Sequence, residues 1–337
     1  MASASPPHRS VRAAWSNGGR VHAILAGMHR PGLPIRLLAA VASALAIALA
    51  ACSQQPAHGD ARVSGLMLDS QLSEISGLAV SNRHDDTLWM HDDGGNPPRL
   101  FAVDREGERV ATFRVEGVPK TDWEDIAAFH QQGRDYLMLA DTGDNGGLRR
   151  TLQLHVIEEP AKLENARLKP AWSIVFRWPD GPRDCEAVAV DERRGEVLLI
   201  SKRRQPPELF RLPLTAQIDP PAVAERVARL RMPAALAPQS GTDERAPLSA
   251  QVTAASISPD GQRLAVLTYR YLLIYAKHPA EDWARAVVRP PRVLTLPWLP
   301  QAEAMGWDRD GRHVYTTGEF VPAPLYRIDV DADADKR

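Results

Sequence analysis

Short apolar runs alternate with turn residues along most of the 337-residue chain. Residues 136–140, 197–200 and 264–267 are apolar throughout, which indicates strands that are covered on both faces. Asp-Gly pairs at 260–261 and 310–311 mark chain reversals, because these residues adopt the left-handed conformations of tight hairpins. The pattern predicts an all-β fold built from many short strands.

These strands recur as a group. Five segments open with a polar residue, continue with small and β-branched residues, and end in a turn. Their lead positions are Glu74, Glu124, Glu186, Thr253 and Glu303, which are 50, 62, 67 and 50 residues apart. Three further strands follow in each repeat except the last, which lacks the fourth. Four strands in a unit of this length predict a β-propeller with five visible blades.

A strand ahead of the first repeat completes the last one. We expect residues 61–68 to pair with residues 324–330, because this pairing joins the ends of the ring and removes open sheet edges. A β-sandwich would explain neither the recurring lead residue nor the missing final strand. A sixth blade within the Pro- and Ala-rich residues 231–251 stays open as an alternative.

An uncharged run of 15 residues, 37–51, precedes the repeats and ends at Cys52. It is short for a membrane span but suits the apolar core of a signal peptide. Ala50 and Ala51 before Cys52 resemble the lipobox of bacterial lipoproteins, in which the cysteine is acylated and becomes the new N-terminus. The alternative is an ordinary secretory signal in which Cys52 has no role.

The lipobox resemblance implies a protein anchored to the cell envelope by lipid. Ser53 follows the cysteine, and in such proteins the absence of Asp at this place implies the outer membrane, facing the periplasm. Met28 opens a compact basic segment before the apolar run, so we expect translation to start there. The expected organisation is a signal peptide over 1–52, a tether over 53–60 and a propeller over 61–337.

Charge and cysteine content narrow the classes of function. The formal net charge is −1, so no overall field favours nucleic acid or an anionic membrane surface. Once the first 52 residues are removed, Cys185 is the remaining cysteine, which excludes an intramolecular disulfide and a zinc site built from cysteines. We expect a monomer that is stabilised by its hydrophobic core.

The lead positions carry the candidate chemistry. In a propeller the first strand of each blade lines the central channel, so equivalent residues form a ring at one mouth. Carboxylates that converge in this way raise one another's pKa, and a cation relieves the repulsion. Oxygen ligands favour Ca²⁺. We predict a calcium site formed by Glu74, Glu124, Glu186 and Glu303.

Loops after the second strands are expected at the same mouth. Asp93, Asp141 and Asp144 lie in Gly-rich loops of the first two repeats and are further candidate metal ligands, although their spacing does not match an EF-hand. Later loops are basic, so Lys202, Arg203 and Arg270 are candidates to bind an anionic ligand. The alternative is structural: a lead Glu accepts hydrogen bonds from the neighbouring blade, and the loops are only turns.

Several segments resemble a group of secreted bacterial propellers without assigned activity. They are residues 74–79, 122–127, 141–145, 184–191 and 301–305, so the resemblance covers about residues 70–320. A Glu that leads the inner strand is more distantly similar to the calcium-binding channel of the gluconolactonase and regucalcin family, onto which Glu74 maps. Calcium-dependent β-propeller phytases are a second distant likeness. These resemblances imply calcium as the cofactor.

Two classes of function follow. The first is a ligand-binding or scaffold propeller on the cell envelope, with a small anionic ligand or an envelope protein as its partner. The second is a calcium-dependent hydrolase of the phosphoesterase or lactonase type, in which the ion polarises the substrate oxygen. No nucleophile–base pair is recognisable from spacing, so the sequence favours the binding module.

Overall fold

The computed structural model describes residues 57–58, 60–236 and 247–332. Cys52, the expected signal peptide with its start at Met28, and residues 53–56 of the expected tether lie outside the described residues. The chain divides into two units, Met1–Gln55 and Pro56–Arg337, and every element below belongs to the second. In the described part of the chain, no helix has both the length and the apolar character needed to span a bilayer.

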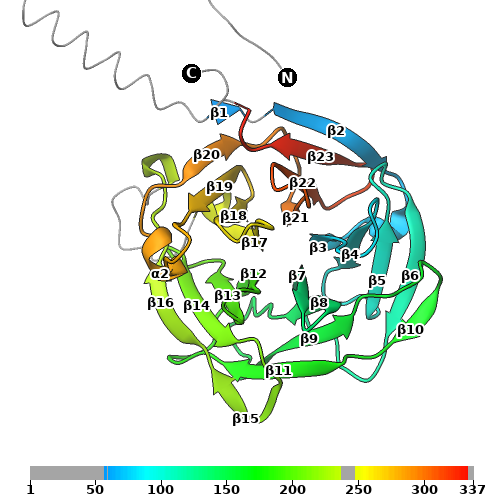
Figure 1. The fold of residues 1–337 in the computed structure, drawn as a ribbon, viewed down its shortest axis with the longest axis horizontal. Coiled ribbons are helices and arrows are strands. Elements are labelled where there is room, and N and C mark those ends of the chain that lie inside the picture. The colour runs from blue at the N-terminus through cyan, green and yellow to red at the C-terminus, as the bar shows by residue number, and fades with distance from the viewer. Residues whose placement is uncertain (1–56, 59, 237–246, 333–337) are drawn as a thin grey trace, which may run out of the picture. The chain divides into compact units, whose positions relative to one another are not determined.

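Five sheets, each built on four antiparallel strands, form the blades of a ring (Figure 1). Blade 1 contains β3 (Ile75–Val80), β4 (Leu88–Asp92), β5 (Arg99–Val103) and β6 (Arg109–Val115). Blade 2 contains β7 (Trp123–Gln131), β8 (Arg134–Asp141), β9 (Leu152–Glu158) and β11 (Trp172–Arg177). Blade 3 contains β12 (Cys185–Asp191), β13 (Glu196–Ser201), β14 (Glu208–Pro213) and β16 (Glu225–Arg229). The expected five-bladed β-propeller is confirmed.

The last two blades complete the ring. Blade 4 contains β17 (Val252–Ile257), β18 (Arg263–Thr268), β19 (Tyr271–Ala276) and β20 (Arg292–Thr295). Blade 5 contains β21 (Ala302–Trp307), β22 (His313–Gly318), β23 (Ala323–Asp329) and β2 (Asp60–Met67). Short helical turns are η2 (Ser70–Leu72), η3 (Ala234–Leu236), η4 (Leu248–Ala250) and α2 (Trp283–Ala286). In the described residues, the 231–251 segment supplies η3 and η4 instead of a sixth blade.

The N-terminal strand closes the propeller as predicted. β2 runs antiparallel to β23, from Asp60 opposite Asp329 to Met67 opposite Ala323. Figure 1 shows the first and last strands of the ring side by side. The outer edge of blade 5 is thereby covered by the other end of the chain, which accounts for the missing fourth strand of the last repeat.

Three short strands were not predicted. β1 (Ala57–His58), β10 (Ala166–Leu168) and β15 (Gln217–Val223) add parallel strands to the outer edges of blades 4, 1 and 2. β10 and β15 each come from the repeat that follows the blade they extend. β15 contains Pro220 and Pro221 and is largely exposed, so no apolar pattern marks it as a strand. These segments tie neighbouring blades together at the rim.

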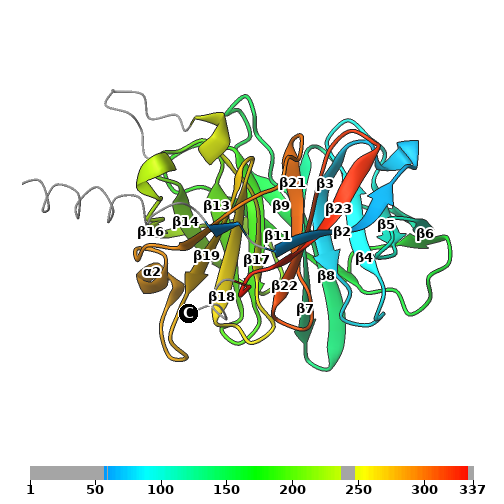
Figure 2. The ribbon, with the colours of Figure 1, turned by 90° about the horizontal axis from the view of Figure 1, so that it is seen from above.

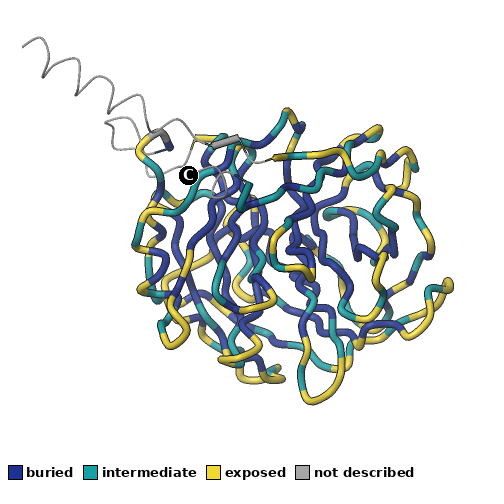
Figure 3. The backbone as a smooth tube through the Cα atoms, turned by 45° about the horizontal axis from the view of Figure 1, so that its top comes forward, coloured by how far each residue is buried: buried dark blue, intermediate teal, exposed yellow. Residues whose placement is uncertain are grey.

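The core lies between blades. Five clusters of buried apolar side chains each fill the space between one blade and the next. Trp89 and Trp123 pack between blades 1 and 2, and Phe129 and Phe210 pack between blades 2 and 3. Figure 2 shows the inner strands side by side in the ring. Figure 3 shows that buried segments fill the interior and that exposed segments lie at the ends. This packing fixes the inner strands around the channel.

Every inner strand carries a β-bulge near its start, where pairing with the second strand shifts by one residue. The bulged residues are Ser76, Glu124, Glu186, Thr253 and Glu303. The structure therefore corrects the alignment of the first repeat. Ile75 already pairs with Asp92, and the shift falls between Ile75 and Gly77, so Ser76 replaces Glu74 in this set.

Candidate functional site

The bulges place two rings of polar residues at one end of the channel. A β-bulge re-aims its side chain and is common beside functional sites. The first ring consists of the bulged residues Ser76, Glu124, Glu186, Thr253 and Glu303. The second ring lies two residues earlier and consists of Glu74, Asp122, Asp184, Gln251 and Gln301. Glu74 thus corresponds to Asp122 and Asp184 instead of to Glu124.

The hydroxyl members of the first ring connect blades. Ser76 donates a hydrogen bond from Oγ to the carbonyl oxygen of Glu124 (2.9 Å). Thr253 donates from Oγ1 to the carbonyl oxygen of Ala302 (2.7 Å). The structural alternative, in which lead residues tie blades together, therefore describes these two positions. The three glutamates behave differently.

Seven carboxyl groups gather at this end, which we call the acid mouth. They are Asp93, Asp122, Glu124, Asp184, Glu186, Glu303 and Glu319. Oxygens of Asp93, Asp122 and Glu124 lie within 4.8 Å of one another, and so do those of Glu124, Asp184 and Glu186. Glu124 belongs to both triads and is 4% exposed. The predicted residues Glu124, Glu186 and Asp93 are thus brought together.

Glu303 joins the same network through an aromatic residue. Tyr269 donates a hydrogen bond to Glu303 Oε1 (2.6 Å), and the Lys202 ammonium lies 5.4 Å from the centre of the Tyr269 ring. Lys202 in turn forms an ion pair with Glu186. Glu319 accepts a hydrogen bond from Gln301 and interacts with Glu303. The blade 5 carboxyls are therefore continuous with those of blades 2 and 3.

Burial and mutual repulsion raise the pKa values of these acids. Burial raises the pKa of Glu124 well above its usual value, and the charge of Glu186 adds to the shift. Burial also raises the pKa of Asp122 to about 6, with a contribution from Asp93. The pKa of Glu319 rises to about 8, mainly through burial and the proximity of Glu303. Charged carboxylates here are costly unless a cation accompanies them.

Protein cations neutralise only part of the acid mouth. Lys202 pairs with Glu186, and Arg203 Nε lies 3.0 Å from Asp184 Oδ2. Within the described residues the other five carboxyls form no ion pair. These five are Asp93, Asp122, Glu124, Glu303 and Glu319. The acid mouth therefore carries excess negative charge whenever its members ionise.

Two glycines let the loops approach the carboxyls closely. A Cβ atom on Gly143 would lie 2.0 Å from Glu124 Oε1 and 2.3 Å from Asp122 Oδ2. A Cβ atom on Gly94 would lie 2.1 Å from Asp122 Oδ1. The β4–β5 and β8–β9 loops therefore enclose Asp122, and a side chain at either glycine would displace the carboxyl groups or the loop.

Other predicted residues hold the loops in place. Asp141 accepts hydrogen bonds from the N–H groups of Thr121 (2.9 Å) and Asp122 (3.1 Å) and pairs with Arg149. Asp144 accepts from the N–H groups of Leu148 (2.8 Å) and Arg149. Asp141 therefore holds the segment before β7, and Asp144 holds its own loop, while neither carboxylate belongs to the two triads.

Glu74 and the basic candidates also have separate environments. Glu74 is exposed and accepts a hydrogen bond from the Asn96 amide (2.6 Å). Arg203 contacts Asn145 as well as Asp184, and Lys202 is buried against Glu186. Arg270 is exposed. Lys202 and Arg203 are therefore occupied by protein carboxylates.

Asp122, Asp184 and Glu319 were not among the predicted ligands. A local signal existed for two of them, because Asp122 and Asp184 each stand two residues before a bulged Glu. The bulge brings residues at this spacing to the same mouth. Glu319 follows the last residue of β22 and has no such signal, since its position depends on the pairing of blade 5.

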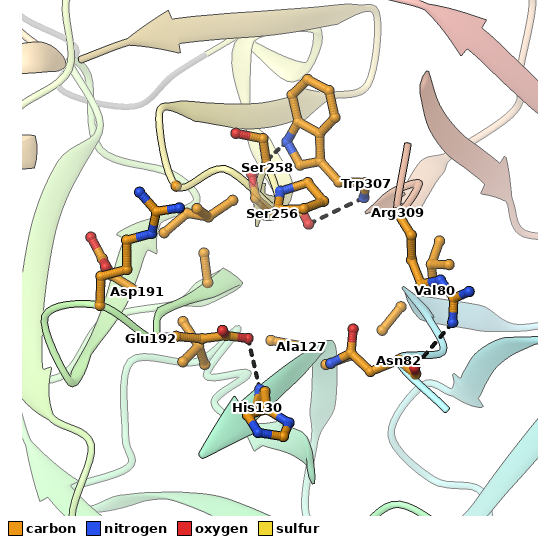
Figure 4. Close-up of a pocket in the computed structure, with 18 of the residues that line it drawn as sticks. Val80, Asn82, Ala127, His130, Asp191, Glu192, Ser256, Ser258, Trp307 and Arg309 are labelled. Carbon is orange, nitrogen blue, oxygen red and sulfur yellow. Dashed lines mark hydrogen bonds between the residues drawn. The ribbon is translucent and has the colours of Figure 1, made fainter. Parts of the chain in front are cut away.

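The opposite end of the channel is chemically different. It holds a cavity of about 280 Å³ lined by residues from the ends of all five inner strands (Figure 4). Asp125 lies between the two levels, one residue after the blade 2 bulge. Its carboxylate accepts hydrogen bonds from the N–H groups of Ile126, Val188 (2.8 Å) and Ala255 (3.2 Å). These bonds connect blades 2, 3 and 4, and the residues that line the cavity are distinct from those of the acid mouth.

Comparisons with known proteins match the fold and give no family. No model of a known protein family matches the chain, and no curated protein matches it. Among solved structures, a nidogen–laminin complex is 14% identical, with 72% of each chain covered and a TM-score of 0.40. Hydrazine synthase of Kuenenia stuttgartiensis is 12% identical, with 76% of this chain and 71% of that chain covered and a TM-score of 0.41.

A third solved structure covers much less of its own chain. Raptor of Chaetomium thermophilum is 14% identical over 77% of this chain and 20% of that chain, with a TM-score of 0.38. These similarities carry no argument about activity. The class defined by the fold and the site is a five-bladed β-propeller with an acidic channel mouth.

Proposed function

We propose that the acid mouth binds a Ca²⁺ ion and that the protein is a calcium-dependent ligand-binding propeller. The observation that carries this proposal is the triad of Asp93, Asp122 and Glu124, whose oxygens lie within 4.8 Å of one another. None of the three forms an ion pair with a described residue. Carboxylate oxygens are the ligands that Ca²⁺ favours. An ion would also relieve the repulsion that raises the pKa values of Asp122 and Glu124.

Charge separates the two overlapping triads. Asp184 and Glu186 already have Arg203 and Lys202 as partners, so a divalent ion beside them would meet two positive charges. Asp93, Asp122 and Glu124 have no such partner among the described residues. We therefore assign the ion to the Asp93–Asp122–Glu124 triad. Glu186, Asp141, Asp144 and Glu74 support the mouth in this proposal.

The coordination number of calcium explains why such a site would bind a ligand. Ca²⁺ takes six to eight oxygen ligands, and three carboxyl groups leave positions for water or for ligand oxygens. An anionic group that occupies these positions would complete the coordination. The proposed role is the recognition of a small anionic ligand or of an acidic group on an envelope protein.

A calcium-dependent hydrolase is the second candidate. The pKa values of Asp122 and Glu319 are about 6 and about 8. Carboxyl groups with pKa values in this range can transfer protons near neutral pH. In this alternative, Ca²⁺ would polarise a phosphoester or lactone oxygen. The two candidates differ in one observable: Asp122→Asn should abolish turnover in a hydrolase but only weaken retention of the ligand in a binding module.

Calorimetric titration of the purified protein with CaCl₂ tests the metal site. Glu124→Gln should lose calcium binding, because it replaces a charged ligand shared by both triads with an amide of the same shape. Bound Ca²⁺ should stabilise the parent by about 2.7 kcal/mol at a hundredfold excess over Kd. Equal calcium binding by parent and Glu124→Gln would refute the site.

Blade 5 offers a matched control. Asp308, Asp310 and His313 also lie within 4.8 Å of one another, but Arg327 contacts both aspartates. An acidic group that is already neutralised should not bind calcium. Asp310→Asn should therefore leave the calcium titration unchanged, which separates a specific site from general loss of surface charge.

We further propose that Cys52 anchors the protein to the cell envelope, with the propeller in the periplasm. Support comes from the apolar run and the small residues before Cys52. Cys52→Ser should release the protein into the soluble periplasmic fraction or leave its precursor uncut. Membrane fractionation identical to that of the parent, with the same cleavage, would rule out lipidation at Cys52.

A further inference from the structure

The cavity opposite the acid mouth has the size and lining of a small-molecule site. Its volume is about 280 Å³, near the lower end of the range for small ligands. Its inner wall is formed by small and branched side chains, among them Val80, Ile126, Ala127 and Ile257. Figure 4 shows polar residues arranged around this opening. A ligand with a compact apolar part would fit such a wall.

Most polar groups around the cavity are already paired. Asp191 accepts hydrogen bonds from Trp283 (2.8 Å) and Lys277 (3.4 Å). Arg309 donates to the carbonyl oxygen of Asn82 (3.0 Å) and pairs with Asp85. These contacts connect blades or loops and hold the wall of the cavity in place. The charges of Asp191 and Arg309 are therefore already paired within the protein.

Two adjacent residues carry opposite charges and form no ion pair in the described part of the chain. Glu192 Oε1 accepts a hydrogen bond from the N–H of His130 (2.7 Å), yet no cationic side chain pairs with its carboxylate. Arg193 lines the same cavity beside Gly261. Its charge acts on Asp260, but its guanidinium forms no ion pair with any described residue. The Asn82 side-chain amide also lacks a described partner.

We propose that this cavity binds a small zwitterion with an apolar side chain, of the amino-acid class. The carboxylate of the ligand would pair with Arg193, its ammonium would pair with Glu192, and its side chain would pack on the apolar wall. A simple anion would face the Glu192 charge, and a simple cation would face Arg193. A zwitterion satisfies both.

The proposal is independent of calcium binding at the acid mouth. The hydrogen bonds of Asp125 to Val188 and Ala255 cross the channel between the two levels. No lining residue of the cavity belongs to the acid mouth. Failure of one site therefore leaves the other untouched.

Three probes of similar size separate the two charges. L-Phenylalanine carries both charges, phenethylamine lacks the carboxylate, and 3-phenylpropanoate lacks the ammonium. Titrations of the purified protein at millimolar concentrations should show the tightest binding for L-phenylalanine. Each missing charge should weaken binding roughly fivefold, because a solvated ion pair contributes about 1 kcal/mol.

Two variants that each remove one charge assign each contact. Arg193→Gln should weaken L-phenylalanine roughly fivefold and leave phenethylamine unchanged. Glu192→Gln should weaken L-phenylalanine to a similar degree without weakening 3-phenylpropanoate. Ala127→Phe should block all three probes by filling the cavity, and Glu124→Gln at the acid mouth should affect none.

Each opposite result overturns the proposal. Absence of L-phenylalanine binding at millimolar concentrations would do so, as would equal binding of the three probes. The same holds if Arg193→Gln and Glu192→Gln weaken every probe alike, because charge recognition would then be absent. Both variants change exposed side chains, so their thermal unfolding should match that of the parent and loss of the fold would not obscure the result.

Discussion

The two ends of one channel are built by the same five strands but have opposite chemistry. At the acid mouth each inner strand bulges, and Glu124, Glu186 and Glu303 project from the bulges toward a common region. At the other end the strands pair regularly, and small residues such as Ala127 and Ala189 leave an open cavity. Backbone irregularity concentrates charge at one end, whereas small side chains create space at the other.

The difference also lies in how charge is balanced. The acid mouth collects seven carboxyls and pairs only Glu186 and Asp184 with protein cations. At the cavity, by contrast, the unpaired charges are one Glu and one Arg among the described residues. The first environment suits a cation, and the second suits a ligand with both signs of charge. Five predictions test this contrast, from the largest effect to the smallest.

Asp125 connects blades 2, 3 and 4 between the two ends. Asp125→Ala would leave the N–H groups of Ile126, Val188 and Ala255 without their acceptor in a buried region. Each unsatisfied buried group costs about 1–3 kcal/mol, so the free energy of unfolding should fall by about 3 kcal/mol or more. Urea denaturation measures this loss. A change below about 1 kcal/mol would show that water replaces the bridge.

Gly143→Ala tests the close approach of the β8–β9 loop to the acid mouth. The added Cβ would overlap Glu124 Oε1 and Asp122 Oδ2, so the loop or the carboxyls must move. Overpacking of this kind costs about 1–3 kcal/mol, and calcium affinity should fall at least about tenfold. Gly146→Ala is the matched control in the same loop, because its Cβ would meet only the exposed Leu148 side chain. Equal calcium affinity in both variants would contradict the prediction.

Stability should depend on pH through the acid mouth. The folded-state pKa values of Asp122 and Glu319 are raised to about 6 and about 8, so both groups favour the folded state when protonated. Metal-free protein should therefore lose stability as pH rises from about 4 through 8, and calcium should restore more stability at pH 8 than at pH 5. Thermal unfolding with chelator and with calcium measures both trends.

The variant Asp122→Asn isolates one part of this pH dependence. It removes the group that titrates near pH 6, so the decline in Tm around that pH should flatten by roughly 2–4 °C relative to the parent. If parent and variant decline identically between pH 5 and 7, Asp122 does not carry a raised pKa.

Glu74 provides the smallest expected effect and tests the corrected register. Because Glu74 is exposed and bonds to Asn96, Glu74→Gln should change calcium affinity by less than about twofold, as expected for a solvated charge near the site. Calorimetry on Glu74→Gln and Glu124→Gln side by side makes the comparison. A loss in Glu74→Gln as large as that in Glu124→Gln would restore Glu74 as a ligand.

The local pattern of the sequence determined the fold. Continuous apolar runs, Asp-Gly turns and four-strand repeats are read from neighbouring residues, and they predicted the five blades. The absence of a last fourth strand, together with residues 61–68, predicted the closure of the ring by β2 and β23. The convergence of Asp93, Glu124 and Glu186 also followed from strand order, because the first strands of all blades line one channel.

Only the tertiary structure decided the register and the partners. A bulge exists through pairing with another strand, so the shift at Ser76 that removes Glu74 from the first ring is invisible in the repeat itself. Lys202 looks like a free cation in sequence, yet folding places it on Glu186. The parallel strands β1, β10 and β15 and the cavity likewise depend on neighbouring blades. Local sequence preference determines where strands form. Pairing between residues that are distant in the sequence determines which charges remain available for a ligand.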